Sequence, residues 1–342
     1  MLVTCRWSVS GVLLLSLLLS GCQGIPVKKQ QAFKVSEVNQ PSLFQRGIVS
    51  QTAEGVLRFR PCFARYDWLL TDPTERLHSR FSEQLAPTVY GEFSLRPGVD
   101  SQHWQVQSIH VLGGGKATCR FPLNGIKYRA AGGRDWVADV TADAVIVQDY
   151  ARRSRWIFPV NQTDVTDTLA WQGEMKDRTG KSIQFALELQ SAVCRDAFAG
   201  EYEFQAELHL DKRTLTGCAR SGDLAQRTLP GHYLAELKVA NTPGRRIDML
   251  LFASGNMELQ QHYLDQQPPV LQQGQWSLLP TGKLLVQIDQ TNGRPDSDLL
   301  LFSRNNSGQL VLEGFNASYG ENQLQLKLIG PDPEQLWHLG VQ

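Results

Sequence analysis

The most reactive side chains in this 342-residue chain are six cysteine thiols, and their spacing limits the chemistry that they can do. Two lie within the first 22 residues, and four are spread over the rest of the chain: Cys62, Cys119, Cys194 and Cys218. Neither a Cys-x-x-Cys pair nor a Cys/His cluster with ligand spacing is present in the sequence, so we predict no metal site and no cofactor. In an oxidising compartment an even number of separated thiols predicts two disulfides, and four cysteines allow three pairings. We favour Cys62–Cys119 with Cys194–Cys218, because each bridge then stays within one predicted domain.

The other polar side chains form no arrangement typical of an enzyme. Asp139 and Asp143 lie four residues apart on one predicted strand and could do acid–base chemistry, but charges on a solvated strand face are the simpler interpretation. The run from Gly113 to Lys116 lacks the flanking residues of a phosphate-binding loop, and we interpret it as a hairpin turn. With no visible set of nucleophile, base and orienting group, we predict no catalytic residue and no enzymatic activity.

The scattered histidines and the tryptophans are expected to be structural. His209 and His232 are interpreted as single strand residues rather than ligands of a soft metal. Four tryptophans could line a ligand cavity, but we expect them to fill domain cores: Trp136, Trp156, Trp171 and Trp276.

Cys22 ends an N-terminal segment that has the order of features found in a secretory signal. Arg6 is followed by an apolar run over residues 9–19, and two small residues then precede the cysteine. The apolar run is too short to cross roughly 30 Å of hydrocarbon, which takes about 20 residues. We therefore predict a signal peptide over residues 1–21.

Residues 19–22, Leu-Ser-Gly-Cys, resemble the lipobox of bacterial lipoproteins. The resemblance implies that Cys22 carries acyl chains such as palmitate and becomes the mature N-terminus. Two or more acyl chains would anchor the protein firmly to a membrane. In these lipoproteins an Asp after the cysteine signals retention in the inner membrane. Gln23 therefore implies an outer-membrane anchor facing the periplasm, with residues 22–44 as a lipid-anchored tether.

The charge balance excludes one class of partner. Lys plus Arg equals Asp plus Glu, at 34 residues each, and the formal net charge is zero. Because nucleic-acid binding relies on a basic surface, we expect no nucleic-acid partner.

Residues 45–122 are predicted to form a small barrel with one helix. Strand-like runs cover residues 56–59, 89–95 and 104–111. Asp72 and Pro73 predict the helix start. An apolar stripe then recurs every four residues, at Leu77, Phe81 and Leu85. Strands around a single helix fit a Greek-key barrel such as the OB-fold.

The same segment resembles the C-terminal OB-fold domain of the NlpE (CutF) family of lipoproteins. The resemblance is carried by Phe59-Arg60-Pro61-Cys62, by Trp68, by residues 89–93 and by a final strand that ends at Cys119. It implies that Cys62 and Cys119 form a disulfide, as the equivalent cysteines do in that family.

Residues 125–221 are predicted to form a β-rich middle domain. One strand is expected over residues 137–147, and residues 185–189 alternate as a half-buried strand. The succession of Cys194, a Tyr-x-Phe strand at residues 202–204 and Gly-Cys-Ala at residues 217–219 resembles a widespread family of uncharacterised bacterial envelope proteins.

Residues 228–330 are predicted to form an antiparallel meander closed into a barrel, followed by a C-terminal tail over residues 331–342. Turn signals such as Thr291-Asn292-Gly293 and Asn305-Asn306-Ser307-Gly308 separate alternating strands at roughly ten-residue intervals. Tyr263-Leu264 and Gly274-Gln275-Trp276 resemble the N-terminal, lipocalin-like domain of the NlpE family. The Cys-x-x-Cys that such domains often carry is missing from residues 239–244, so copper or redox chemistry is not expected there.

The expected fold is therefore mainly β, with three small antiparallel domains after a lipoprotein signal. The resemblance to the NlpE family implies a non-catalytic outer-membrane lipoprotein that senses surface contact or envelope stress through an envelope signalling protein or other envelope proteins. The alternative is a lipocalin-like carrier that holds a small apolar ligand in the third domain. A long apolar cavity would favour the carrier, and side chains filling the barrel would favour the interaction role.

Overall fold

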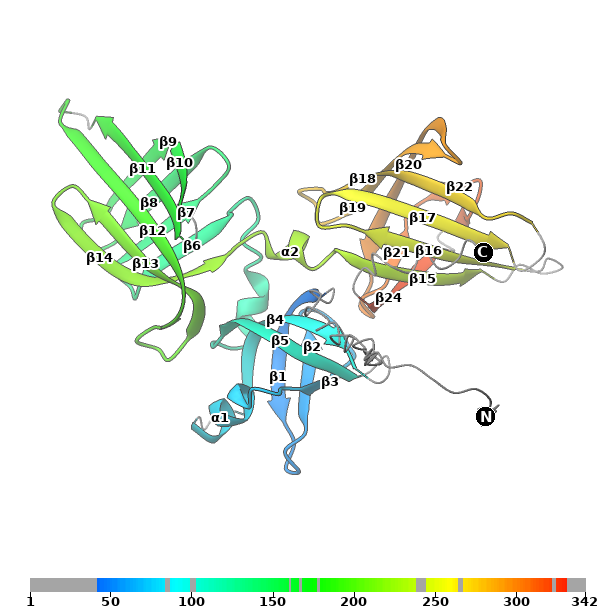
Figure 1. The fold of residues 1–342 in the computed structure, drawn as a ribbon, viewed down its shortest axis with the longest axis horizontal. Helices are drawn as coiled ribbons and strands as arrows, with labels where there is room; N and C mark the ends of the chain where they lie inside the picture. The colour runs from blue at the N-terminus through cyan, green and yellow to red at the C-terminus, as the bar shows by residue number, and fades with distance from the viewer. Residues whose placement is uncertain are drawn as a thin grey trace, which may run out of the picture. The chain divides into compact units, whose positions relative to one another are not determined.

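The computed structural model describes residues 42–83, 87–98, 103–159, 161–165, 168–176, 179–237, 244–263, 267–321 and 324–330. Within this part the chain is mainly β, as the sequence predicts (Figure 1). No helix in the described ranges is long and apolar enough to cross a membrane. The predicted signal peptide, the acylated Cys22, nearly all of the tether, Leu85 and the C-terminal tail lie outside the described residues.

The first part of the chain forms a five-stranded barrel with one helix. Its elements are β1 (Leu43–Gln51), β2 (Leu57–Pro61), β3 (Trp68–Thr71), α1 (Arg76–Glu83), β4 (Thr88–Pro97), β5 (His103–Leu112) and the 3-10 helix η1 (Lys116–Arg120). The strands pair in the order β3-β2-β1-β4-β5, and a parallel pair of β3 with β5 closes the ring. The strand number and the single helix between β3 and β4 agree with the predicted OB-fold.

The helix begins later than predicted. Asp72 does act before the helix, because its carboxylate accepts the backbone N–H of Leu77 at 2.8 Å. Glu75, however, has a φ of 55°, in the left-handed region that an α-helix cannot contain. The α-helix therefore starts at Arg76, and the prediction that Pro73 occupies the first helical position is wrong.

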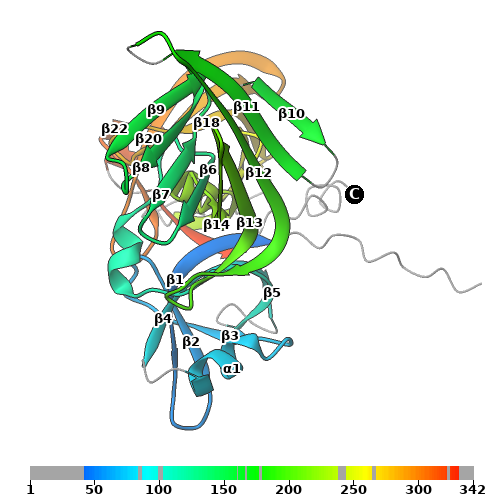
Figure 2. The same ribbon diagram turned by 90° about the vertical axis from the view of Figure 1, so that its left-hand side faces the viewer.

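The middle part has nine antiparallel strands within the described ranges, and consecutive strands pair as in a meander except β9 and β10. They are β6 (Tyr128–Gly132), β7 (Trp136–Val140), β8 (Ala144–Asp149), β9 (Ser154–Pro159), β10 (Asn161–Val165), β11 (Thr168–Lys176), β12 (Ser182–Arg195), β13 (Glu201–Leu210) and β14 (Arg213–Ser221). The last strand, β14, pairs with β6, so the meander curls back on itself (Figure 2). One end of β13 also pairs with β5, so this sheet is continuous with that of the first barrel.

The single strand predicted over residues 137–147 is two strands. A turn separates the end of β7 at Val140 from the start of β8 at Ala144, and Asp143 lies exposed in that turn. Asp139 is only 7% exposed and accepts two hydrogen bonds from Arg129, at 2.6 and 2.8 Å. The interpretation of both aspartates as solvated strand charges is therefore wrong for Asp139, whose buried carboxylate has a cationic partner.

The last part is a closed barrel of eight strands, preceded by the short helix α2 (Leu224–Arg227). The strands are β15 (Gly231–Leu237), β16 (Arg245–Leu251), β17 (Asn256–Tyr263), β18 (Val270–Leu278), β19 (Leu284–Thr291), β20 (Arg294–Arg304), β21 (Leu310–Leu312) and β24 (Gln325–Gly330). A small two-stranded ribbon, β22 (Phe315–Asn316) with β23 (Gly320–Glu321), lies in the connection before β24. Asn292 and Gly293, with φ of 50° and 72°, form the β19–β20 turn at the predicted position.

A buried ion pair links β4 with β14. The guanidinium of Arg220 contacts the carboxylate of Glu92, which has no exposed surface, and the Tyr90 hydroxyl donates to the same carboxylate at 2.6 Å. Burial lowers the pKa of Arg220 to about 10. Taking two charges out of water is expensive, so such a pair is costly to break from one side only.

We expect Arg220→Leu to lower the free energy of unfolding by about 3–5 kcal/mol, because Glu92 would remain buried without its cation. The double variant Glu92→Leu/Arg220→Leu should recover most of that loss, since neither charge is then buried. Urea unfolding of both variants measures the difference. A double variant that is as unstable as Arg220→Leu would show that packing, rather than the unpaired charge, causes the loss.

Candidate functional site

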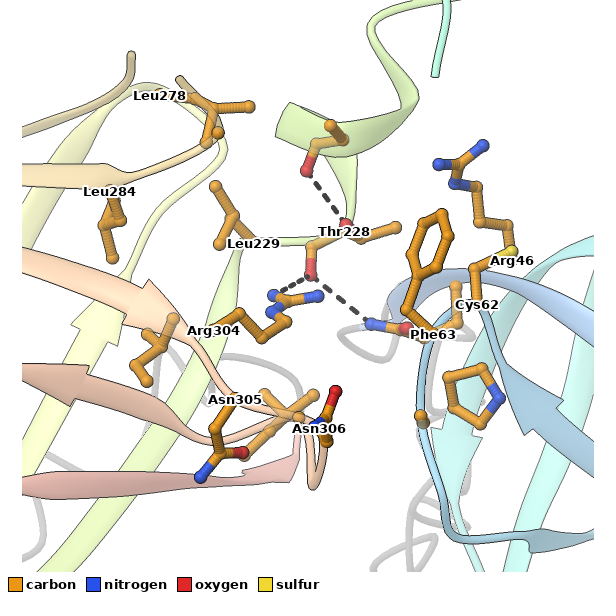
Figure 3. Close-up of a pocket in the computed structure, with 18 of the residues that line it drawn as sticks. Arg46, Cys62, Phe63, Thr228, Leu229, Leu278, Leu284, Arg304, Asn305 and Asn306 are labelled. Atoms are coloured by element: carbon orange, nitrogen blue, oxygen red, sulfur yellow. Dashed lines mark hydrogen bonds between the residues drawn. The ribbon is translucent and has the colours of Figure 1, made fainter. Parts of the chain in front are cut away.

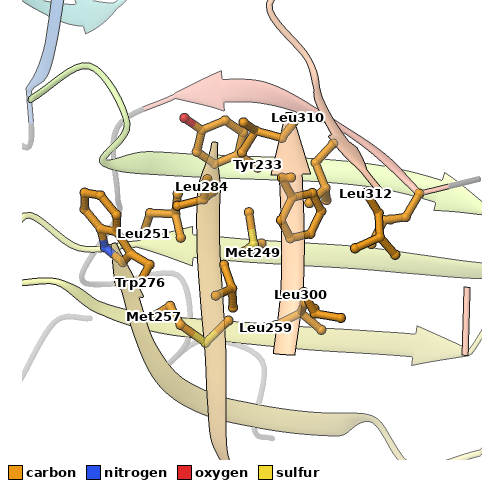
Figure 4. Close-up of a cluster of buried hydrophobic side chains, with 14 of the residues drawn as sticks. Tyr233, Met249, Leu251, Met257, Leu259, Trp276, Leu284, Leu300, Leu310 and Leu312 are labelled. Atoms are coloured by element: carbon orange, nitrogen blue, oxygen red, sulfur yellow. The ribbon is translucent and has the colours of Figure 1, made fainter. Parts of the chain in front are cut away.

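The C-terminal barrel is packed with side chains rather than hollow (Figure 4). Every member of its core is exposed by 5% or less, and several are fully buried, among them Tyr233, Ile247, Met249, Leu251, Leu259 and Val286. Side chains with no accessible surface border no space that a water molecule could enter. An eight-stranded barrel is only wide enough for its own side chains or one small ligand, and here the side chains take that space.

One end of this barrel holds a polar network whose members satisfy one another. The Gln261 amide donates to Gln272 at 3.2 Å and to the Tyr319 hydroxyl at 2.9 Å. Arg245 donates to the Gln261 carbonyl at 2.9 Å, and its guanidinium lies 5.2 Å from the centre of the Tyr319 ring. Burial raises the pKa of Tyr319, which keeps its hydroxyl neutral. We interpret this network as structural, because its hydrogen bonds are made within the barrel.

A pocket of about 330 Å³ lies at the opposite end of the barrel (Figure 3). Leu284, Phe302 and Leu310 lie beneath it as the last layer of the barrel core. The half-buried Leu278 and Leu328 belong to its apolar wall. The first barrel contributes another part of the wall, through Pro61, Cys62, Phe63, Ala64 and Tyr66.

Arg304, at the end of β20, brings positive charge to the pocket. Its guanidinium donates to the carbonyl of Thr228 at 3.4 Å, and the Gln45 amide donates to the same oxygen at 3.4 Å. Both bonds are longer than the usual range and therefore weak. Burial raises the pKa of Tyr66 in the pocket wall, and the charge of Arg304 opposes that rise.

The β20–β21 hairpin fits closely against the first barrel. The backbone N–H of Arg65 donates to the carbonyl of Asn306 at 3.1 Å. Gly308 has a φ of 78°, and a Cβ at this position would lie 2.6 Å from the Tyr66 hydroxyl. The left-handed backbone favours glycine here, and any larger residue would also require the Tyr66 ring to shift. The predicted turn at residues 305–308 therefore also shapes the pocket.

The pocket wall includes a turn held by the first disulfide. Cys62 is bonded to Cys119, with the Cα atoms 5.5 Å apart, and its N–H donates to the carbonyl of Arg46 at 2.9 Å. The next residue, Phe63, has a φ of 66°, which is unusual for a bulky side chain. The Arg46 guanidinium in turn donates to the carbonyls of Cys119 and Phe121, each at 3.2 Å. The disulfide and Arg46 therefore hold together the turn at Cys62 and the segment from Cys119 to Phe121.

Exposed apolar side chains lie close in sequence to the cysteines of both disulfides. Phe63 and Phe121, which follow Cys62 and Cys119 closely in sequence, are 70% and 62% exposed. The second bridge, Cys194–Cys218, has the same feature, because Val193 is 56% and Phe198 62% exposed. Exposed aromatic rings are common anchors of protein interfaces.

Ser94, His110 and Glu203 form a hydrogen-bonded relay that sequence reasoning missed. The Ser94 hydroxyl lies 2.8 Å from Nε2 of His110, whose Nδ1 lies 2.7 Å from the Glu203 carboxylate. Hydroxyl, imidazole and carboxylate follow the order of a serine hydrolase triad. However, Ser94 lies within a strand paired on both sides, opposite Phe44 and Ser108, so the sheet occupies the backbone that an oxyanion site would need. We interpret the relay as a tie between β4, β5 and β13.

The disulfides and the tryptophans lie where the sequence places them. Cys62 pairs with Cys119, and Cys194 pairs with Cys218, which is the pairing favoured from the sequence. Three of the four tryptophans are buried in cores, and Trp156 packs against the core of the middle part. The run at residues 113–115 leads from β5 into η1, so the prediction of a hairpin turn there is wrong.

The singled-out histidines each have a local protein partner. His209 lies 2.8 Å from Glu207, and Nε2 of His232 lies 2.8 Å from the Asp248 carboxylate. Over the residues that the structure describes, no group of three or more His, Cys, Asp or Glu side chains is arranged to hold a metal ion.

Comparison with known proteins assigns no family. No protein-family model and no curated protein matches the sequence. Among solved structures, a mutant Aleuria aurantia lectin in complex with Fucα1-6GlcNAc is matched over 86% of this chain and 98% of that chain, with 9% identity and a TM-score of 0.13. A similarity at that level carries no structural or functional argument.

The relay predicts a pH-dependent stability. Burial disfavours the charge of Glu203, but hydrogen bonds from His110 and Ser221 outweigh burial and lower the pKa of this carboxyl. A carboxyl whose pKa is lowered by folding contributes stability above its unfolded value of about 4, and that contribution is lost as the pH falls through the folded value. Glu203→Gln should therefore cost about 1–2 kcal/mol at pH 7, and the difference from the unaltered protein should shrink at about pH 3.

Urea unfolding at the two pH values tests this expectation. Glu207→Gln is the matched control, because Glu207 lies on the same strand with its side chain 48% exposed. Equal losses for Glu203→Gln at both pH values would contradict a role for the carboxylate charge.

Proposed function

We propose that this chain is a non-catalytic lipoprotein of the bacterial envelope that works through protein contacts, anchored to the outer membrane by acyl chains on Cys22. The lipobox-like residues 19–22 and the Gln23 that follows support the anchor and its membrane. The packed C-terminal barrel supports a scaffold rather than a container for a long apolar ligand.

The observation that carries the proposal is the surface around the Cys62–Cys119 disulfide. Two exposed aromatic rings, Phe63 and Phe121, flank this bridge. Removing large exposed apolar groups from water is favourable, so contiguous apolar surface often marks an interaction site. Aromatic side chains are also enriched at binding hot spots. The function therefore resides in this surface, which binds another envelope protein.

The disulfide gives this surface a way to report the state of the envelope. Reduction would free Cys62 from Cys119 and release the strained backbone of Phe63, since only the hydrogen bonds of the turn would then hold it. The loss of the bridge costs at most about 4 kcal/mol in the chain-entropy account, which is a large share of the stability of a small domain. A partner that binds the ordered turn would thus distinguish the oxidised from the reduced protein.

We expect Phe63→Ser to reduce crosslinking to envelope partners several-fold without changing the unfolding midpoint, because the ring is exposed and contributes to no core. A photoreactive amino acid placed at Ala64, followed by mass spectrometry of the crosslinked proteins in living cells, measures the yield. Phe315→Ser is the matched control, because Phe315 is 77% exposed but lies on the small ribbon of the C-terminal barrel.

The same crosslinks in a Gln23→Asp background test the signalling role. A sensor protein of the inner membrane should be captured when the lipoprotein is retained there. Identical captures in both backgrounds, or equal yields for Phe63→Ser and the unaltered protein, would sink the proposal.

A further inference from the structure

The pocket at the end of the C-terminal barrel has a positively charged environment. Some arginines elsewhere in the described ranges, such as Arg46 and Arg245, bond neutral acceptors, whereas others pair with carboxylates: Arg60 with Asp67, Arg76 with Glu201, Arg129 with Asp139, Arg213 with Asp149 and Arg246 with Asp248. Arg304 has no carboxylate within ion-pair distance among the described residues, and the residues that line the pocket include no Asp or Glu. Its positive charge is therefore left without a counter-ion from the protein.

The groups around Arg304 compensate its charge only weakly. Among the described residues, its guanidinium donates to the carbonyl of Thr228 at 3.4 Å, an oxygen shared with Gln45, and it also interacts with the hydroxyl of Tyr233. Both of these groups are neutral. Arg46 also borders the pocket, and its guanidinium is bonded to backbone carbonyls, so a second full positive charge lies nearby. The hairpin next to Arg304 adds the carboxamide of Asn306, which lies at the pocket rim in Figure 3.

One part of the wall is apolar. Leu278 and Leu328 contribute half-buried side chains from the barrel, and Phe63 faces the pocket from the first barrel. The volume of about 330 Å³ is near the lower end of the range for small-molecule sites. It suits one short chain or ring, and a lipid with two long acyl chains is too large.

We propose that this pocket binds a small amphipathic monocarboxylate, with the carboxylate on Arg304 and the apolar part along Leu278, Leu328 and Phe63. A planar guanidinium offers two parallel N–H donors that match the two oxygens of a carboxylate. The apolar wall favours a ligand with an apolar part, because burying that part removes apolar surface from water. A free inorganic anion has no such surface. The inference goes beyond the protein contacts proposed above and rests on different residues, although both surfaces use the turn at Phe63.

The test compares three ligands of one chain length: decanoate, decanol and decylammonium. Calorimetric titration uses residues 22–342 with Cys22→Ser, so that neither an attached acyl chain nor detergent competes, and stays below micelle-forming concentrations. Decanoate should bind at least about tenfold more tightly than decanol, because a hydrogen-bonded charge pair is added to the same apolar contact. Decylammonium should bind most weakly.

Arg304→Gln should lower the affinity for decanoate about tenfold, to that for decanol, and should leave decanol binding unchanged. Arg294→Gln is the matched control, because Arg294 is the exposed residue at the other end of the same strand. A diazirine analogue of decanoate should label peptides that contain residues 61–66 or 302–310.

Four outcomes would overturn the inference. They are no saturable decanoate binding, equal affinity for decanoate and decanol, an effect of Arg294→Gln as large as that of Arg304→Gln, and labelling confined to other parts of the chain. Thermal unfolding of each variant identifies a loss of binding that results from misfolding. If Arg304→Gln is less stable, Arg304→Lys should restore tighter binding of decanoate than of decanol, and its failure to do so would also overturn the inference.

Discussion

The covalent link between Cys62 and Cys119 is the constraint on which the candidate site depends. A bulky residue such as Phe63 adopts a left-handed backbone only where its surroundings hold it there, at a cost of about 1–3 kcal/mol. The bridge holds one side of the turn, and the N–H of Ala64, which donates to the carbonyl of Pro61 at 3.0 Å, holds the other. Arg46 donates hydrogen bonds to the backbone carbonyls of Cys119 and Phe121, which lie on the other side of the bridge. The exposed rings and the pocket wall are consequences of that arrangement.

The closed barrel sets a second limit, which concerns where binding can occur. Closure pairs each strand of this barrel with two neighbours over at least part of its length, which limits the sheet edge that could recruit another strand. The eight strands enclose a space that Met249, Leu259 and Val286 and their neighbours fill. The space left for a ligand lies at the end of the barrel, where the last layer of the core meets residues of the OB-like barrel. A lipocalin-like strand count is therefore compatible with a ligand at the mouth but leaves no room for one along the axis.

Local patterns in the sequence predict the strands well and the site poorly. Alternating apolar residues mark β4, β5, β12, β13 and the strands of the last barrel, and the favoured disulfide pairing follows from keeping each bridge within a domain. The start of α1 was mispredicted because a left-handed Glu75 is invisible to helix propensity. The relay and the pocket were missed for a different reason. His110 and Glu203 are 93 residues apart, and Tyr66 meets Gly308 across an even longer stretch of sequence, so no periodicity or motif connects them. An Asn-Asn-Ser-Gly turn predicts a tight hairpin but does not predict the ring that packs on it.

The two proposed binding events share the backbone between Pro61 and Tyr66, and this sharing has a thermodynamic consequence. Phe63 contributes to the pocket wall and is also the exposed ring offered to a protein partner. A ligand that orders the turn lowers the conformational entropy that a partner must still remove, so each binding event strengthens the other. A ligand that draws Phe63 towards Leu278 and Leu328 instead removes the ring from the partner surface, and the coupling then has the opposite sign. Linkage requires the coupling to be equal in both directions, whichever sign applies. The position of one side chain on a disulfide-held turn therefore decides whether a small carboxylate promotes or blocks the protein contact.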